Sequence, residues 1–234
     1  MAQIVPYGEF GLTIYFSNQI SEVTTHKIQH FIHLLERERI YGLQDWIPTY
    51  TTITLYFDPY LLSYEDLYNQ IMIIYNNITT LDPVKSRLFE VPVCYEERFA
   101  PDLLFISNYH KIEVSEIIKI HSDPVYRVAM IGFMPGFPYL SGMDRRIITP
   151  RKSAPSLKIE GGSVGIAGEQ TGIYPFTSPG GWNIIGKTPL KLFDASRNEP
   201  FLFRQGDQIR FKPISLDEYK QLERKLKKGT LTFF

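Results

Sequence analysis

Glycine and aromatic residues are concentrated in one stretch of the chain, from Gly132 to Gly186. Eleven of the sixteen glycines lie there. Glycine loses more backbone entropy on folding than any other residue, so such crowding indicates turns with positive φ or backbone held close to another group. Aromatic side chains in the same stretch can form the wall of a pocket, with polar contacts supplied by the bare backbone. We therefore predict a binding site built from Phe133, Phe137, Tyr139, Tyr174 and Trp182.

A pocket of this kind needs a few polar groups that converge on the ligand. Arg151 is a candidate catalytic residue because a guanidinium holds a carboxylate or phosphate through two N–H groups at once. Ser163, Gln170 and Lys187 are the other polar candidates. The alternative interpretation of Arg151 is a surface arginine, and that of Ser163 is a Gly-rich turn between barrel strands. His121 lies at the expected end of a helix, where the helix dipole stabilises a protonated ring and can tune it for acid–base catalysis. The alternative is a capping or packing histidine.

Two Pro-Gly pairs turn the chain sharply beside these aromatic residues. The first, Pro135-Gly136, lies between Phe133 and Phe137, and the second, Pro179-Gly180, precedes Gly181 and Trp182. We include Pro135, Gly180 and Gly181 among the substrate-binding residues for this reason. The alternative is that the aromatic residues are ordinary core.

Three motif matches are interpreted as accidental. Residues 181–188 fit the P-loop pattern G-x-x-x-x-G-K-[ST], but the interior predicts a strand and Pro189 follows, whereas a P-loop needs a helix there. Residues 161–165 fit the nucleophile elbow G-x-S-x-G without the helix that must follow it. His26, His30 and His33 lie on adjacent turns of a predicted helix, yet a solvated polar face is the more common outcome than a metal site. We predict no metal.

The elements that position these residues fall into two predicted domains. Residues 1–85 are expected to form an α+β domain, with strands at 12–16 and 47–57 and helices at 22–38 and 64–77. Residues 86–234 are expected to form a β-barrel, because short strands are separated there by Gly and Pro. A strand at 88–95 and short helices at 103–106 and 115–121 begin this second domain. A last helix at 217–227 is expected to turn Leu222 and Leu226 inward and to end at Gly229.

Composition excludes several function classes. Lys plus Arg and Asp plus Glu are both 25, so no basic field attracts nucleic acid. The sequence shows neither a signal peptide nor an apolar run long enough to cross a membrane, which predicts a cytoplasmic protein without a membrane partner. The single cysteine, Cys94, fits a reducing compartment.

Four segments of the chain carry a resemblance to a known family. They are GFMPGFPYLSGMD from Gly132, Pro150-Arg151, GSVGIAGEQTGIYPFTSPGGWNIIGKTPLKLFD from Gly162, and GDQIRF from Gly206. The chain resembles the B component of bacterial ATP-dependent 5-oxoprolinases over most of residues 88–214. This family is also known as allophanate hydrolase subunit 1, or carboxyltransferase subdomain C/D, and includes a sporulation-kinase inhibitor. The sequence departs from the family at Lys187, where arginine is usual.

The resemblance implies a small N-terminal α/β sandwich followed by a cyclophilin-like barrel. It implies an enzyme subunit, inactive or nearly so alone, that works with the homologous C component and the A component to hydrolyse 5-oxo-L-proline to L-glutamate, with ATP bound by the assembled complex. Two other functions stay open: inhibition of a sensor histidine kinase, and a carboxyltransferase-type subunit acting on urea or allophanate. Their partners differ, because the first requires a kinase and the second requires a biotin carrier.

Overall fold

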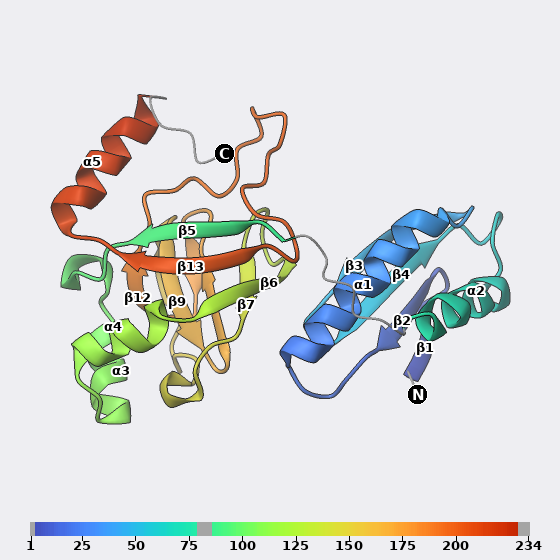
Figure 1. Cartoon of the computed structure of the whole chain (residues 1–234), viewed down its shortest axis with the longest axis horizontal. Coiled ribbons are helices and arrows are strands. Elements are labelled where there is room, and N and C mark those ends of the chain that lie inside the picture. The colour runs from blue at the N-terminus through green and yellow to red at the C-terminus, as the bar shows by residue number, and fades with distance from the viewer. Residues whose placement is uncertain (1–2, 79–85, 229–234) are drawn as a thin grey trace. The chain divides into compact units, whose positions relative to one another are not determined.

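The computed structural model describes residues 3–78 and 86–228. The chain divides into two compact units, residues 1–85 and residues 86–234, and each unit has its own apolar core. Figure 1 shows both units, with the N-terminal one in blue to teal and the barrel in green to red. No helix in the described ranges is long and apolar enough to cross a lipid bilayer.

The N-terminal unit is a four-stranded antiparallel sheet packed against two helices. The strand order is β1-β2-β4-β3. Both helices contribute to the core, which also buries alternate residues of β4: Ile53, Leu55 and Phe57. This alternation is what a sheet with one covered face requires. Its elements are β1 (Gln3–Tyr7), β2 (Gly11–Tyr15), α1 (Glu22–Glu38), β3 (Leu43–Pro48), β4 (Thr52–Phe57) and α2 (Tyr64–Asn76).

Serine residues begin both helices of this unit. The side chain of Ser21 accepts a hydrogen bond from the backbone N–H of Thr24, and Ser63 does the same for Asp66. Each serine thereby satisfies one of the N–H groups that a helix start leaves unpaired. The predicted helices at 22–38 and 64–77 are confirmed to within one residue.

The single strand predicted at 47–57 is wrong, because the chain turns inside it. Strands β3 and β4 pair antiparallel, with Pro48 opposite Ile53. The turn between them is held by Thr49, whose side-chain oxygen accepts hydrogen bonds from the backbone N–H groups of Thr51 and Thr52. Threonine favours strands in general, so this local role is not visible in the composition of the segment.

The C-terminal unit contains a seven-stranded sheet that rolls into a nearly closed barrel. The order is β12-β9-β10-β7-β6-β13-β5, antiparallel except for the parallel pair β13 and β5. Figure 1 shows β5, β13 and β6 crossing in front of β9 and β12. The strands are β5 (Leu88–Val93), β6 (Val125–Ile131), β7 (Pro138–Ser141), β9 (Ser163–Ala167), β10 (Gln170–Ile173), β12 (Asn183–Lys187) and β13 (Gln208–Pro213), beside a two-stranded ribbon of β8 (Ser156–Ile159) and β11 (Ser178–Gly180).

One backbone bridge joins the two edges of the rolled sheet. Cys94, directly after β5, donates its backbone N–H to the carbonyl oxygen of Lys187 on β12 at 2.9 Å and accepts the return bond at 3.0 Å. Gly186 makes this approach possible, because an added Cβ would lie 2.6 Å from Cγ1 of Val93. The sheet therefore lacks a bare edge where these strand ends meet.

Short helices lie beside the strands of the barrel. They are η1 (Glu97–Phe99), α3 (Leu103–His110), α4 (Val114–Ser122), η2 (Arg145–Ile147) and α5 (Leu216–Lys227). A capping box of Ser215 and Glu218 begins α5, and Tyr219 packs on Phe99 with ring centroids 4.6 Å apart. Leu226 packs against the barrel core as predicted, whereas the predicted helix end at Gly229 lies outside the described residues.

Candidate functional site

The aromatic residues singled out from the sequence lie together in the barrel unit. Phe137 is at the centre, with its ring centroid 4.7 Å from Tyr139, 5.1 Å from Tyr174 and 5.3 Å from Trp182. Tyr174 and Trp182 meet the central ring edge to face, an arrangement that aromatic pairs favour. Phe137, Tyr174 and Trp182 are buried, and Tyr139 is half-buried. We call this group, with Phe133, the aromatic cluster.

The loop between β6 and β7 delivers Phe137 to the cluster. The backbone N–H of Phe137 donates to the carbonyl oxygen of Met134 at 3.1 Å, across a turn with Pro135 and Gly136 at its centre. Gly136 has a φ of +83°, the conformation that the third residue of a type II turn requires. The exposed Pro135 thus shapes the loop that presents the ring.

Arg151 is placed at the rim of the aromatic cluster by anchors on both sides. The side-chain amide of Asn183 donates to the carbonyl oxygen of Pro150 at 2.9 Å, and the backbone N–H of Lys152 donates to the carbonyl oxygen of Gly181 at 2.8 Å. Arg151 itself is an exposed residue. Burial raises the pKa of both tyrosines of the cluster, that of Tyr174 to about 12, and the charge of Arg151 offsets part of this increase.

A buried carboxylate that no sequence pattern signals supports this segment. Asp102 forms an ion pair with Lys152, 2.6 Å from Oδ1 to Nζ, and its other oxygen accepts the backbone N–H of Ile184 at 2.7 Å. Asp102 therefore ties the start of α3 both to the segment beside Arg151 and to β12. Residues so far apart in the chain share no local motif, so sequence reasoning has nothing from which to predict this pair.

His121 lies in the barrel core, and both ring nitrogens are bonded. The hydroxyl of Thr171 donates to the carbonyl oxygen of Gly165. The same hydroxyl oxygen therefore accepts a hydrogen bond from Nε2–H of His121, at 3.0 Å. Since Nε2 carries the proton, Nδ1 is the acceptor, and it accepts from the hydroxyl of Tyr95 at 2.9 Å. The ring also stacks on Phe211 with centroids 4.6 Å apart. Burial lowers the pKa of His121 to about 3, so the ring is neutral near pH 7.

This environment differs from the one that the sequence predicts for His121. A helix end favours the protonated ring, but desolvation has the opposite effect on its pKa and is larger. The hydrogen-bond and ring partners of His121 are Tyr95, Thr171, Tyr126 and Phe211, none of which belongs to the aromatic cluster. Its catalytic role stays a prediction.

Lys187 lies where the barrel closes. Its ammonium forms an ion pair with Glu160, which lowers the pKa of that carboxyl, and it lies 5.4 Å from the ring centroid of Phe99. These partners differ from those of Arg151 and of His121. The three predicted catalytic residues therefore occupy three separate environments.

The remaining predicted site residues lie on the strands around the cluster. Ser163 is buried at the start of β9, and Gln170 is half-buried at the start of β10. Gly180 lies against the Tyr174 hydroxyl so closely that a Cβ has no room there, and Gly181 accepts the hydrogen bond that holds Lys152. The glycines thus allow the close packing of the cluster that their crowding indicates.

The structure agrees that two of the motif matches, those to a P-loop and to a nucleophile elbow, are accidental. Residues 183–187 form β12, with no phosphate-binding turn before a helix, and residues 163–167 form β9 instead of a strand-to-helix elbow. Within the described ranges, no three His, Cys, Asp or Glu side chains are grouped to hold a metal ion.

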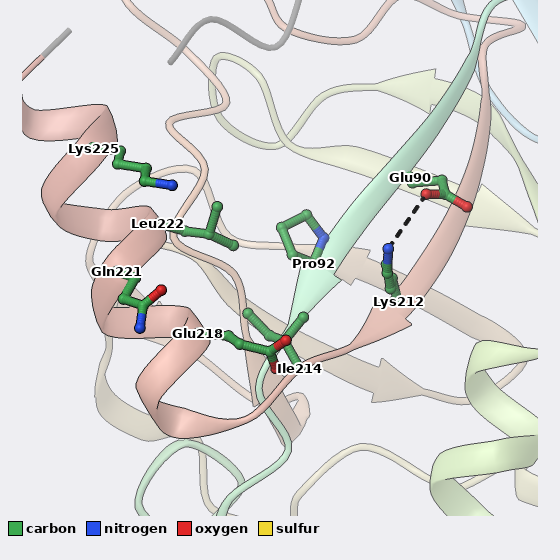
Figure 2. A pocket seen from close by; sticks show the side chains of 8 residues that line it. All are labelled: Glu90, Pro92, Lys212, Ile214, Glu218, Gln221, Leu222 and Lys225. Carbon is green, nitrogen blue, oxygen red and sulfur yellow. Dashed lines mark ion pairs between the residues drawn. The ribbon is translucent and has the colours of Figure 1, made fainter. Parts of the chain in front are cut away.

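A separate groove of about 330 Å³ lies between α5 and the strands β5 and β13. Figure 2 shows Glu218, Gln221, Leu222 and Lys225 of α5 facing Glu90 and Pro92 of β5 and Lys212 and Ile214 of β13 and its end. Lys212 pairs with Glu90 at 3.9 Å, and Glu218 caps its own helix. Since charges of both signs are already paired here, the aromatic cluster with Arg151 is the better candidate site.

A match to a protein-family model identifies this chain as a carboxyltransferase-type domain. The model for the carboxyltransferase domain, subdomain C and D, matches residues 2–203. The B component of the 5-oxoprolinase of Bacillus subtilis (strain 168) is 38% identical over 227 residues, which cover 93% of this chain and 95% of that protein. The chain belongs to the family of 5-oxoprolinase B components.

Solved structures extend the comparison. A conserved uncharacterized protein from Pyrococcus horikoshii is 39% identical, with a TM-score of 0.57 over 93% of this chain and 100% of that one. The urea amidolyase of K. lactis has a TM-score of 0.81 over 100% of this chain at 20% identity, which is a likeness of fold alone. This chain spans 16% of that protein and 40% of another longer solved chain, which is 32% identical with a TM-score of 0.77.

Proposed function

We propose that this chain is the B component of an ATP-dependent 5-oxoprolinase that works in the cytoplasm with components C and A. The observation that carries the proposal is the 38% identity to a protein of that name along 95% of its length. The proposed reaction is hydrolysis of 5-oxo-L-proline to L-glutamate. The proposal extends to the fold names: an α/β sandwich for the N-terminal unit and a cyclophilin-like class for the barrel.

The chemistry of the site supports a substrate with a flat ring and a carboxylate. Tyr139 offers a half-buried aromatic face, and Arg151 offers two parallel N–H groups at the rim. A lactam carbonyl is a poor electrophile, so its oxygen must be polarised or converted into a leaving group. Lys187 lies in a separate environment beside Glu160 and Phe99, so its catalytic role stays a prediction apart from this cluster.

The buried part of the aromatic cluster supports an enzyme that is incomplete alone. Phe137, Tyr174 and Trp182 are 5% exposed or less, so in this chain alone they pack against one another and leave little surface for a ligand. This chain then supplies one wall of the site, and a partner protein supplies the other. ATP is assigned to the assembled complex because the family resemblance implies it; in this chain, the segment that matches a P-loop is strand β12.

The test is reconstitution with the presumed components C and A, measuring glutamate formation and ADP release from 5-oxo-L-proline. We expect turnover in the full mixture only. Arg151→Ala should raise KM for 5-oxo-L-proline about tenfold to a hundredfold, the value of a charge-assisted hydrogen-bonded pair. Arg145→Ala removes another exposed arginine of the barrel unit and serves as the matched control. A well-formed complex without turnover would refute the proposal.

A carboxyltransferase-type subunit is the second candidate function. The match of residues 2–203 to the carboxyltransferase domain family favours it. It predicts carboxyl transfer from a biotin carrier to urea or a related amide, so the same complex supplied with carboxybiotin separates the two functions. Inhibition of a sensor histidine kinase is the third, and it predicts loss of kinase autophosphorylation without any small substrate.

A further inference from the structure

Phe133 has an unusual backbone conformation for its residue type. Its φ is +67°, and among the residues described, Arg39 and Lys111 are the other non-glycine residues with positive φ. Those two end helices α1 and α3, where a left-handed residue is common. Phe133 lies in the loop between β6 and β7, so its conformation needs another explanation.

The loop contains two consecutive turns that fix Phe133 at this φ. The backbone N–H of Met134 donates to the carbonyl oxygen of Gly132 at 2.8 Å, which together with the positive φ makes Phe133 the centre of a strained γ-turn. The turn around Pro135 and Gly136 follows directly, and Gly132 donates its N–H to the carbonyl oxygen of Phe137 at 3.2 Å. A Cβ on Gly136 would lie 2.9 Å from Cβ of Phe193, so the loop is also pressed against its neighbour.

The strain holds an apolar ring in solvent. Phe133 is 67% exposed and meets Phe137 edge to face with centroids 5.8 Å apart. For the isolated chain, glycine is the better residue for this backbone and a polar side chain is the better one for this exposure. Phe133 goes against both of these preferences, which indicates a functional role that offsets the lost stability. For an exposed aromatic ring on a rigid loop, that role is binding.

We infer that Phe133 is a preorganised anchor for a partner protein, whose surface has an apolar pocket that receives the phenyl ring. The neighbouring buried rings of the aromatic cluster fill their own space, so the outward face of Phe133 meets a partner instead of a small ligand. A rigid aromatic side chain at the centre of an interface is typical of a binding hot spot, and the γ-turn removes the need to order it on association. The inference rests on the proposed function, because the partner used to test it is the presumed C component of that assembly.

The experiment compares Phe133→Gly with wild type in two measurements. Urea denaturation should give a higher unfolding midpoint for the variant, because glycine accepts the positive φ without strain. Calorimetric titration with the presumed C component should give a dissociation constant about thirtyfold larger, the loss expected for a hot-spot residue. Lys111→Gly is the matched control: it should also raise the midpoint and leave the dissociation constant unchanged. Phe133→Tyr should restore binding.

Each contrary result has a distinct meaning. A lower midpoint for Phe133→Gly refutes the strain, and an unchanged dissociation constant refutes the anchor. An unchanged dissociation constant with a raised KM for 5-oxo-L-proline places the ring on the substrate and also overturns the inference. A wild-type complex that forms without turnover, but is weakened by Phe133→Gly, supports the anchor while the proposed function fails. Failure of the wild-type chain to bind the C component overturns the anchor.

Discussion

The buried ring of His121 makes the stability of the barrel depend on pH. In the folded chain the ring is fully buried and its pKa is lowered to about 3, whereas an unfolded histidine has a pKa near 6.5. Below pH 6.5 the unfolded chain takes up a proton that the folded chain does not. The unfolded state is therefore favoured progressively as the pH falls.

The size of the effect follows from the two pKa values. Each pH unit below about 6.5 lowers the free energy of unfolding by about 1.4 kcal/mol until the folded ring also protonates near pH 3. Between pH 7 and pH 5 the loss is about 2 kcal/mol. Carboxylates whose pKa is lowered in the folded state, such as Asp144 and Glu160, lose their contribution at lower pH, so the histidine dominates this window.

The assay is urea denaturation at pH 7 and pH 5, followed by tryptophan fluorescence. Trp46 lies in the N-terminal unit and Trp182 in the barrel, so a Trp46→Phe background isolates the barrel signal. This separation matters because two units need not unfold in one step. His121→Gln removes the titrating group and should remove about 2 kcal/mol of the difference between the two pH values. It should also lower stability at pH 7, because the hydrogen bonds to Tyr95 and Thr171 are disturbed.

His33→Gln is the control, since it removes an exposed histidine of the N-terminal unit. It should leave the pH dependence of the barrel unchanged. His110, whose pKa burial also lowers, stays present in both proteins and cancels in the comparison. Equal pH dependence in wild type and His121→Gln would refute the reasoning, because the buried ring would then titrate alike in both states.

Three further predictions concern the barrel. Gly186→Ala should lower the free energy of unfolding by about 1–3 kcal/mol, since the new Cβ meets Val93 and the backbone of Cys94; an unchanged urea midpoint would contradict the closure geometry. Asp102→Ala should cost about 1–3 kcal/mol by leaving the N–H of Ile184 unpaired, and Lys152→Ala should cost less because that bond survives; equal losses would count against this assignment. Burial raises the pKa of the Cys94 thiol, so iodoacetamide at pH 8 should label it slowly in the native protein and rapidly in urea, and fast native labelling would show the bridge to be open.

Local signals in the sequence are sufficient to predict the two helices of the N-terminal unit, whereas the helix predicted at 103–106 extends to His110. The helix at 22–38 is predictable at its observed bounds because an apolar face repeats along it and Ser21 caps its start. The segment at 47–57 is mispredicted for a local reason as well, since the hydroxyl of Thr49 forms the turn that splits it. Composition alone does not distinguish a threonine that lies in a strand from one that forms a turn.

The arrangement of the site is predictable only where glycine and aromatic residues are close in the sequence. Phe137, Tyr139, Tyr174 and Trp182 do pack together, as their spacing among glycines indicates. The pairing of Asp102 with Lys152 and the burial of His121 depend on which strands become neighbours. That order is a property of the whole barrel, so the residues themselves carry no local signal of it.

The parallel pairing of β5 with β13 also sets the order of events during protein synthesis. β5 is the first strand of the barrel to leave the ribosome, and its partner along residues 88–93 is the last strand, residues 208–213. At usual elongation rates the roughly 120 residues between them take about 6 to 24 s to make. During that time an apolar strand has no neighbour. Glu90 and Pro92, which interrupt it, are the residue types that keep a waiting strand from pairing with another nascent chain.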